Sequence, residues 1–256
     1  MVLVIDIGNT HMTLGVFSGN DLVCDWRIMT DQHRTADEYG MVFETLFAHK
    51  GLRTGDIQGI IISCVVPPLR SVTEQLCVRY FHVQPLFVDH AMDTGITICY
   101  EPVSDVGADR IVNAAAAYHT YKQSAVVVDF GTATTFDYIT PDGKYVGGVI
   151  APGIAISSEA LFRKASKLPR VDFVPPTKVI GGTTVESMQS GIIFGYVSLV
   201  DGLVERILAE ACTDPVIIAT GGLARLIASY TKTINDVDEN LTLKGLKILY
   251  ERTVRR

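Results

Sequence analysis

The chain has 256 residues, of which 48% are hydrophobic, and a formal net charge of -6 at pH 7. This length allows one large domain or two small ones with a substantial core. The negative charge argues against a protein that binds nucleic acid or an anionic membrane, because such partners attract basic surfaces. The first residues lack the cationic flank of a signal peptide, and no apolar run approaches membrane-spanning length. We therefore expect a cytoplasmic globular protein.

The cysteines and histidines show no metal-binding pattern. The five cysteines are scattered and form no C-x-x-C pair: Cys24, Cys64, Cys77, Cys99 and Cys212. We expect reduced thiols that are buried as small hydrophobic side chains. The absence of H-E-x-x-H or a similar spacing among the six histidines argues against a zinc site. His11 lies in a predicted hairpin, where a half-exposed turn residue is the expected role.

The first motif follows the apolar run at residues 2–5 and reads Asp6-Ile7-Gly8-Asn9-Thr10. A strand that ends in a carboxylate and a glycine allows the backbone to turn tightly, so that polar side chains and N–H groups face a polyanion. The same plan returns in Val128-Asp129-Phe130-Gly131-Thr132. Two copies in matching strand–turn–strand contexts predict an internal duplication with a phosphate-binding hairpin in each half.

The first half reads as three strands followed by alternating helices and strands. Thr35-Ala36-Asp37-Glu38 is a capping box that predicts a helix ending at Gly51. Pro67-Pro68 stops a short β-branched run, which therefore indicates a buried strand. A second helix is expected over 69–81. Strands are predicted at residues 2–5, 14–17, 22–28, 59–66 and 86–88, an order that suggests a mixed sheet flanked by helices.

The second half restarts this order after a helix over 104–121, capped by Ser104 or Asp105. We place the division near residue 122, with halves at 1–122 and 123–256. Residues 168–182 are expected to form an ordered loop, and residues 183–211 one long helix or two helices that break at Gly191 or Gly195. Further elements are expected at 125–129, 134–139 and 145–149 (strands), 154–164 (helix), 216–220 (strand) and 223–230 (helix).

Two such hairpins are predicted to face each other across a nucleotide cleft. A nucleoside triphosphate suits this cleft, with Asp6 near the phosphates or their Mg²⁺ and with Asn9, Thr10 and Thr132 as donors. The Gly221-Gly222 turn, between a buried strand and a helix, allows an adenine or a ribose to approach the backbone. Each turn alone is more often a simple strand connection, but the three together in this order favour the nucleotide.

These motifs resemble the duplicated ribonuclease-H-like ATPases, which include actin, sugar kinases and acetate kinases, and within them the type III pantothenate kinases. The resemblance implies an α/β fold of two ribonuclease-H-like (actin-like ATPase) halves, each a mixed sheet with flanking helices. It covers nearly the whole chain, and its specific parts are Gly107-Ala108-Asp109-Arg110 and Asp129-Phe130-Gly131-Thr132-Ala133-Thr134. Gly147-Gly148, Pro152-Gly153 and Gly221-Gly222 also match.

The resemblance implies transfer of the γ-phosphoryl group of ATP to the primary hydroxyl of pantothenate, the first step of coenzyme A synthesis. Asp109 matches the general base, and we expect the adjacent helix N-terminus to keep it ionised. The implied pantothenate contacts are Tyr100, Gly107, Ala108, Asp109, Arg110 and Thr184, and Arg110 suits the substrate carboxylate. The implied ATP contacts are Asp6, Ile7, Gly8, Asn9, Thr10, His11, Met12, Thr13 and Thr132.

Single residues among these also have plain structural interpretations. Asp109 alone is typical of a carboxylate that stabilises a helix N-terminus, Arg110 of a surface ion pair and Thr184 of the N-cap of the long helix. Asp129 matches the family's ligand for potassium or ammonium, although the residues alone do not separate this role from Mg²⁺ binding. Thr183 stands where the family has Asn.

The resemblance also implies a homodimer, and core packing of residues 188–204 is the alternative explanation for their apolar character. Two other functions remain open from sequence. One is a non-catalytic transcriptional regulator on the same fold, and the other is a kinase for a different small hydroxyl substrate. The carboxylates Asp6, Asp109 and Asp129, with Arg110, favour a kinase over a regulator, because a binding protein needs no base.

Overall fold

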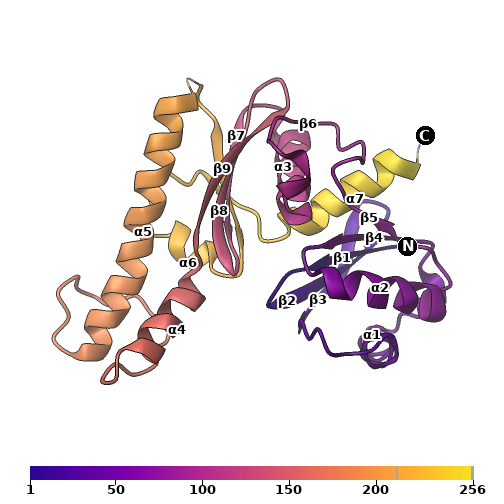
Figure 1. Cartoon of the computed structure of the whole chain (residues 1–256), viewed down its shortest axis with the longest axis horizontal. Helices are drawn as coiled ribbons and strands as arrows, with labels where there is room; N and C mark the ends of the chain where they lie inside the picture. The colour runs from indigo at the N-terminus through magenta and orange to yellow at the C-terminus, as the bar shows by residue number, and fades with distance from the viewer. Residues whose placement is uncertain (212, 255–256) are drawn as a thin grey trace. The chain divides into compact units, whose positions relative to one another are not determined.

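The computed structural model describes residues 1–211 and 213–254, so that Cys212 lies outside the described residues. The chain divides into two compact units (Figure 1). The first unit contains Met1–Ala116 together with the segment from Asn240, and the second contains Ala117–Glu239. The sequence predicts that the two halves of the duplication divide near residue 122, and this division stays a prediction. The compact units differ from it at the C-terminus, where helix α7 packs on strands of the first unit.

The first unit contains a five-stranded sheet in the order β3-β2-β1-β4-β5. Strands β1, β2 and β3 are antiparallel, whereas β4 and β5 run parallel to β1. The strands are β1 (Val2–Ile7), β2 (His11–Ser18), β3 (Asp21–Met29), β4 (Gly59–Cys64) and β5 (Leu86–Phe87), and a short strand, β6 (Thr97–Ile98), follows. The antiparallel meander and the parallel strands beside it are the mixed sheet that the sequence predicts.

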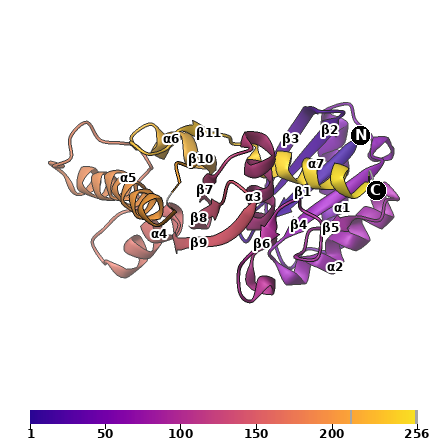
Figure 2. The ribbon, with the colours of Figure 1, turned by 90° about the horizontal axis from the view of Figure 1, so that it is seen from above.

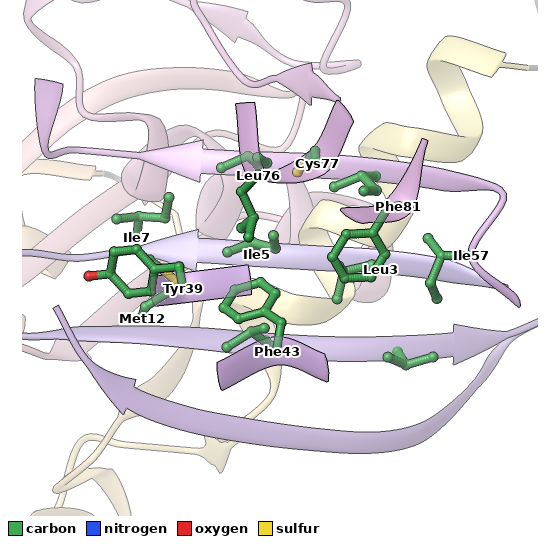
Figure 3. Packing of buried hydrophobic residues seen from close by; sticks show 14 of the residues in the cluster. Leu3, Ile5, Ile7, Met12, Tyr39, Phe43, Ile57, Leu76, Cys77 and Phe81 are labelled. Atoms are coloured by element: carbon green, nitrogen blue, oxygen red, sulfur yellow. The ribbon is translucent and has the colours of Figure 1, made fainter. Parts of the chain in front are cut away.

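Helices cover both faces of this sheet. Alternate residues of β1, Leu3, Ile5 and Ile7, belong to the core against α1 (Ala36–His49) and α2 (Pro67–Leu76), as Figure 3 shows. Tyr39 and Phe43 of α1 point into that core (Figure 3). On the other face, α7 (Leu241–Val254) lies across β1 and β4 (Figure 2). Alternate side chains of β1 therefore pack on helices on opposite faces of the sheet.

The second unit repeats this strand order. Its strands follow the order β11-β10-β7-β8-β9, with β7, β8 and β9 antiparallel and with β10 and β11 parallel to β7. They are β7 (Ala125–Phe130), β8 (Ala133–Ile139), β9 (Lys144–Pro152), β10 (Val216–Gly221) and β11 (Asp236–Val237). Its helices are α4 (Ile154–Lys164), α5 (Thr184–Ala211) and α6 (Ala224–Ala228). The duplication predicted from the two hairpins is thus present in the topology.

Several element boundaries differ from the prediction. Helix α3 (Ala108–Tyr121) begins after a separate 3₁₀ turn, Val103–Asp105, so neither Ser104 nor Asp105 caps it. Helix α2 starts at Pro67, because proline fits the first turn of a helix, and it continues as a π-helical turn at Cys77–Phe81. Helix α5 runs unbroken through both of its candidate break points, and another 3₁₀ turn lies at Thr54–Asp56.

The cysteine prediction is correct only in part. The described cysteines Cys24, Cys64, Cys77 and Cys99 are free thiols, and Cys24 and Cys77 are buried. Cys99 is exposed, so its predicted burial is wrong. Among the described residues, the helices are too short or too polar for any of them to cross a bilayer.

Candidate active site

Two hydrogen bonds fix the backbone of the turn in the first hairpin. Gly8 N–H donates to His11 O across the turn at 3.0 Å, and the Thr30 hydroxyl donates to Gly8 O at 2.7 Å. Asn9 and Thr10 are exposed at the tip. The pKa of the exposed His11 is lowered by partial desolvation and by the charge of Arg27. This turn therefore presents polar groups on a fixed backbone.

Two of the residues predicted to contact ATP have buried side chains. Ile7 and Met12 are fully buried in the core of the first unit. The strand alternation explains this, because Ile7 and Met12 are paired across β1 and β2 and share the face that packs on α1 and α2. Only their backbone atoms remain for a ligand. Asp6 and Thr13 are the next pair and lie on the opposite face.

The carboxylate of Asp6 is flanked on both sides by a hydroxyl residue. In the sheet register, Asp6 lies opposite Thr13 of β2 and beside Ser63 of β4. Directly paired residues of neighbouring strands project to the same face. The carboxyl end of β1 therefore carries a polar row, Thr13–Asp6–Ser63, of which the sequence predicted the first two members.

The second hairpin forms a tighter site around Asp129. Asp129 is paired with Thr135 of β8 and with Thr220 of β10, so a row Thr135–Asp129–Thr220 matches the row of the first unit. Gly221 has φ +92°, and a Cβ placed there would lie 2.6 Å from Asp129 Oδ1. Only glycine fits this position. The structure thus places Gly221 of the Gly221-Gly222 turn next to Asp129 of the second Asp-x-Gly turn.

Thr132, the predicted ATP donor of this hairpin, is exposed and lies next to the start of α4. Gly153 N–H donates to Thr132 O at 3.0 Å. A Cβ at Gly153 would lie 2.3 Å from the same oxygen. Pro152-Gly153 therefore allows α4 to begin against the hairpin. That this hairpin faces the first one across a nucleotide cleft stays a prediction.

A buried carboxylate that the sequence analysis missed adjoins Asp129. Asp137 in β8 is fully buried. Its Oδ1 accepts a hydrogen bond from Tyr145 OH at 2.7 Å, and its Oδ2 accepts one from the Thr135 hydroxyl at 3.1 Å. Thr135 is the residue opposite Asp129 in the sheet register, so the hydroxyl beside the predicted cation ligand donates to a buried carboxylate. An Asp between two aromatic residues, Phe136 and Tyr138, in a predicted strand is the sequence signal that identifies it.

The carboxylate of Asp109 folds back over Gly107 in the first turn of α3. Asp109 Oδ1 accepts from the Arg110 N–H at 2.8 Å, and a Cβ at Gly107 would lie only 2.4 Å from the same oxygen. Burial raises the pKa of Asp109, although the Arg110 N–H and the Arg110 charge oppose this shift. The N–H groups at the helix start do lower the pKa, as expected of a helix N-terminus, but the effect of burial is larger. That Asp109 is ionised in the working enzyme stays a prediction. A raised pKa suits a proton acceptor better than an ordinary one.

Arg110 is not a surface residue, which removes the surface ion pair as an explanation. Its exposed fraction is 7%, and its guanidinium carbon lies 5.9 Å from the centroid of the half-buried Tyr100 ring. Such a distance is within the range of a cation–π contact. Two of the predicted pantothenate residues therefore contact each other.

The segment that carries Asp109 lies beside the first hairpin. Val65 N–H donates to Ile7 O at 3.0 Å, which holds the end of β4 against the end of β1. A Cβ at Gly107 would be in van der Waals contact with Val65 Cγ1, at 3.7 Å. Within the first unit, the structure thus places Gly107 next to the strand ends that carry Asp6.

Thr184 lies elsewhere in the sequence, at the start of α5, and Thr183 rather than Thr184 caps this helix. The Thr183 hydroxyl accepts from Glu186 N–H at 3.2 Å, and Glu186 Oε2 accepts from Thr183 N–H at 3.1 Å. This is a capping box, which the spacing Thr183-x-x-Glu186 encodes. Thr and Asn both cap helices, so Thr183 fills the structural role of the expected Asn. The predicted N-cap role of Thr184 is wrong.

Thr184 is therefore free of the capping role, and it lines a cavity of about 650 Å³ between α4 and α5. The two helices lie side by side in the second unit (Figure 1). The other lining residues are Ser157, Ser158, Leu161, Leu168, Gly181, Gly182, Thr183, Ser187, Met188, Gly191, Ile192 and Tyr196. Hydroxyl and apolar groups are both present, as in many small-molecule sites.

Sequence comparison relates this chain to proteins of one described family. Residues 2–206 match the model of a family described as type III pantothenate kinase. The type III pantothenate kinase of Syntrophus aciditrophicus (strain SB) is 54% identical over 252 residues, which cover 98% of this chain and 99% of that protein.

Solved structures share the fold at low sequence identity. A protein described as a conserved putative Baf family transcriptional activator, from Campylobacter jejuni, has a TM-score of 0.62 at 19% identity, covering 99% of this chain and 100% of that chain. A putative N-acetylglucosamine kinase from Porphyromonas gingivalis has a TM-score of 0.53 at 11% identity and covers 100% of both chains. Together with the repeated strand order, these likenesses confirm the predicted fold class of two mixed sheets with flanking helices.

Proposed function

The chain belongs to the type III pantothenate kinase family, and from this premise we propose which of its residues carry out the reaction. It is an enzyme that uses ATP to phosphorylate pantothenate, the first step of coenzyme A biosynthesis. A regulator on the same fold receives no such support, because the likeness to the Campylobacter jejuni protein rests on 19% identity and concerns the fold alone. We also propose the cytoplasm as its compartment, where ATP is available.

Asp109 is the proposed general base. The observation that carries this assignment is the half-buried carboxylate held over Gly107, next to the buried Arg110 and beside the strand end that carries Asp6. A primary alcohol is a poor nucleophile, and a carboxylate within hydrogen-bond reach accepts its proton as the phosphoryl group transfers. The raised pKa of Asp109 brings it closer to the pH at which it works.

The remaining proposed pantothenate contacts come from both units. Arg110 presents a planar fork that suits the carboxylate of pantothenate, and Tyr100 packs beside it. Gly107 and Ala108 contribute backbone close to the substrate. Thr184, which lines the cavity between α4 and α5, is the proposed contact from the second unit.

The first hairpin is the proposed phosphate site for ATP. Its exposed turn offers N–H groups and the side chains of Asn9 and Thr10, and Thr132 in the second hairpin is the further proposed donor. The carboxylate of Asp6 and the neighbouring hydroxyl groups form a hard oxygen donor set, which fits Mg²⁺. Bound Mg²⁺ would neutralise charge on the phosphates.

Asp129 is the proposed ligand of a monovalent cation, potassium or ammonium. In its favour, Thr135 and Thr220 flank the carboxylate, and the glycine at position 221 leaves room above it. Oxygen ligands suit such an ion, whose charge would offset that of nearby phosphates. Replacing K⁺ by Na⁺ should slow the enzyme, and a rate indifferent to this exchange would contradict the assignment.

A homodimer is the proposed assembly. Large apolar side chains are exposed around the start of α5, and the most exposed is Ile180, at 89%. Val174, Val179 and Val185 are exposed in the same segment. Apolar side chains gathered next to the Thr184 cavity suit burial by a second copy of the chain. Light scattering should give twice the chain mass, and Ile180→Asp should lower it.

One assay tests the activity itself. Purified protein is incubated with ATP, Mg²⁺ and K⁺, with or without pantothenate, and ADP is measured. We expect ADP to form only when pantothenate is present. Panthenol, which lacks the carboxylate, and glycerol serve as alternative hydroxyl substrates. ADP formation with another alcohol but not with pantothenate would favour the different-substrate alternative, and no substrate-dependent ADP would contradict the kinase.

A further inference from the structure

Ser63 places a hydroxyl group where the fold does not use one. It is the next-to-last residue of β4, and its exposed fraction is 0%. Its Oγ has no hydrogen-bond partner among the described residues. A buried hydroxyl without a partner destabilises a fold, whereas alanine at the same place would not. Stability of the unit therefore does not explain a serine at this position.

The turn after β4 is held by the neighbours of Ser63. Cys64 Sγ donates to Val66 O at 3.3 Å, and Val65 N–H donates to Ile7 O at 3.0 Å. Helix α2 then starts with Pro67, which needs no side-chain cap from Ser63. The hydroxyl of Ser63 thus takes no part in capping or in the turn.

The register places Ser63 beside Asp6 on the same face of the sheet. Residues nearer the start of these strands on this face are apolar, since Val4 pairs with Ile61 and both are fully buried. The face changes from apolar to polar at the pair of Asp6 and Ser63. The hydroxyl therefore appears where the strand end meets the proposed phosphate site.

The second unit repeats this arrangement independently. There, Thr220 occupies the place of Ser63 beside Asp129, and its exposed fraction is 1%. A buried hydroxyl beside the aspartate at the end of the central strand thus occurs in both halves. A single occurrence could be a coincidence of the sequence. The same pair in both units indicates that the hydroxyl has a role that involves the aspartate.

We propose that Ser63 is a positioning residue for Mg²⁺-bound ATP, and that its hydroxyl hydrogen-bonds a water molecule in the coordination shell of the ion held at Asp6. The proposal rests on the proposed function, in which Asp6 receives the nucleotide. Mg²⁺ keeps several of its waters and is usually bound through one or two carboxylates. Groups that hydrogen-bond such waters orient the ion without touching it.

Titration calorimetry tests the proposal by measuring ATP binding with excess Mg²⁺ and, separately, with EDTA. We expect Ser63→Ala to weaken Mg²⁺-dependent binding by about tenfold, as for other groups that support metal ligands. Binding in EDTA should not change. Ser63→Thr, which keeps the hydroxyl as Thr220 does, should bind as the wild type does.

Thr73→Val is the matched control, because Thr73 of α2 is also fully buried but donates to Leu69 O at 2.7 Å. It should lower the melting temperature and leave the Mg²⁺ dependence unchanged. Equal weakening of Ser63→Ala in Mg²⁺ and in EDTA would overturn the proposal, and so would no weakening in Mg²⁺. If Ser63→Ala does not fold, the nearly isosteric Ser63→Cys must show the same Mg²⁺-dependent loss. A wild type that binds no ATP would instead refute the proposed function.

Discussion

The two halves have the same strand order but different strand ends. In the first, three residues separate β1 from β2, whereas two residues separate β7 from β8 in the second, and the tips of both turns are exposed. Cys64 in the first half takes the register position that Gly221 takes in the second. Asp129 leans over that glycine, and its neighbour Thr135 is tied to the buried Asp137.

This difference teaches how a duplicated fold divides two tasks. The longer turn of the first half, with Asn9 and Thr10 exposed at its tip, suits a ligand that arrives and leaves, such as a nucleotide. A carboxylate that lies against a glycine turn, opposite a threonine that donates to a buried aspartate, suits an ion of fixed position. Neither specialisation follows from the strand order, since both halves share it.

Removing the base, which lies in the first unit, should have the largest effect. Asp109→Asn keeps the shape of the side chain but not its ability to accept a proton. We expect turnover to fall by about a thousandfold, within the range of general base catalysis, while ATP binding persists. Steady-state kinetics and calorimetry measure the two quantities.

Asp105→Asn is the control, because Asp105 is exposed in the preceding 3₁₀ turn and should retain full activity. An Asp109→Asn enzyme with appreciable turnover would place the base on another residue.

The pH dependence of the rate should carry the signature of this carboxylate. Asp109 must be ionised to accept a proton, and its pKa is raised by burial. The acid limb of kcat/KM should therefore lie above the range of an ordinary aspartate, with the rate falling about tenfold per pH unit below it. A pH–rate profile from pH 4 to 8 measures the limb. An acid limb at the ordinary aspartate pKa would contradict the effect of burial.

The same pKa predicts a stability change of defined sign. Because the folded state binds the proton more tightly than the unfolded state, Asp109 lowers the free energy of unfolding as the pH rises from its ordinary to its raised pKa. Above this range the carboxylate is ionised in both states, and the free energy of unfolding is lowered by the full amount. Asp109→Asn removes this effect, so this variant should melt at a higher temperature than the wild type at pH 7 and show little such difference at low pH.

Gly221→Ala tests whether stability and cation preference depend on the position of the Asp129 carboxylate beside Gly221. The new Cβ would lie 2.6 Å from Asp129 Oδ1, at a φ of +92° that side chains rarely adopt. We expect a loss of about 1–3 kcal/mol of stability from overpacking, together with loss of the K⁺ over Na⁺ preference. Thermal melting and rates in the two salts measure these effects.

The matched variant is Gly131→Ala in the hairpin itself. There the added Cβ would lie 3.7 Å from Asp129 Oδ1, an ordinary contact distance. It should keep the cation preference. If both variants lose the K⁺ over Na⁺ preference equally, the position of the Asp129 carboxylate beside Gly221 does not select the ion.

The capping boxes offer the smallest and most evenly matched comparison. Thr35 with Glu38 caps α1, and Thr183 with Glu186 caps α5. Each Thr→Ala substitution should cost about 1 kcal/mol, and Thr183→Asn should cost little. Chemical denaturation measures both. A larger effect of Thr183→Ala on the KM for pantothenate than on stability would show that Thr183 acts on the substrate as well as on the helix.

Local patterns were sufficient where a short segment decides its own structure. The two Asp-x-Gly hairpins, the capping box at Thr35 and the stop at Pro67-Pro68 each occur where the sequence predicts them. The cap of α5 was misassigned to Thr184 although Thr183-x-x-Glu186 carries the correct signal. The buried state of Arg110 and the upward shift of the Asp109 pKa were not predictable, because burial depends on what distant segments cover.

The sequence by itself determined the duplicated α/β fold, the two hairpins and, through the family motifs, the reaction, because these depend on short-range periodicity, turn residues and motif spacing. Only the tertiary structure decided which hydroxyl groups flank Asp6 and Asp129, why position 221 must be glycine, and that the buried Asp137 accepts from Thr135, opposite Asp129. Register between strands far apart in the chain creates these contacts, and no local pattern encodes that register.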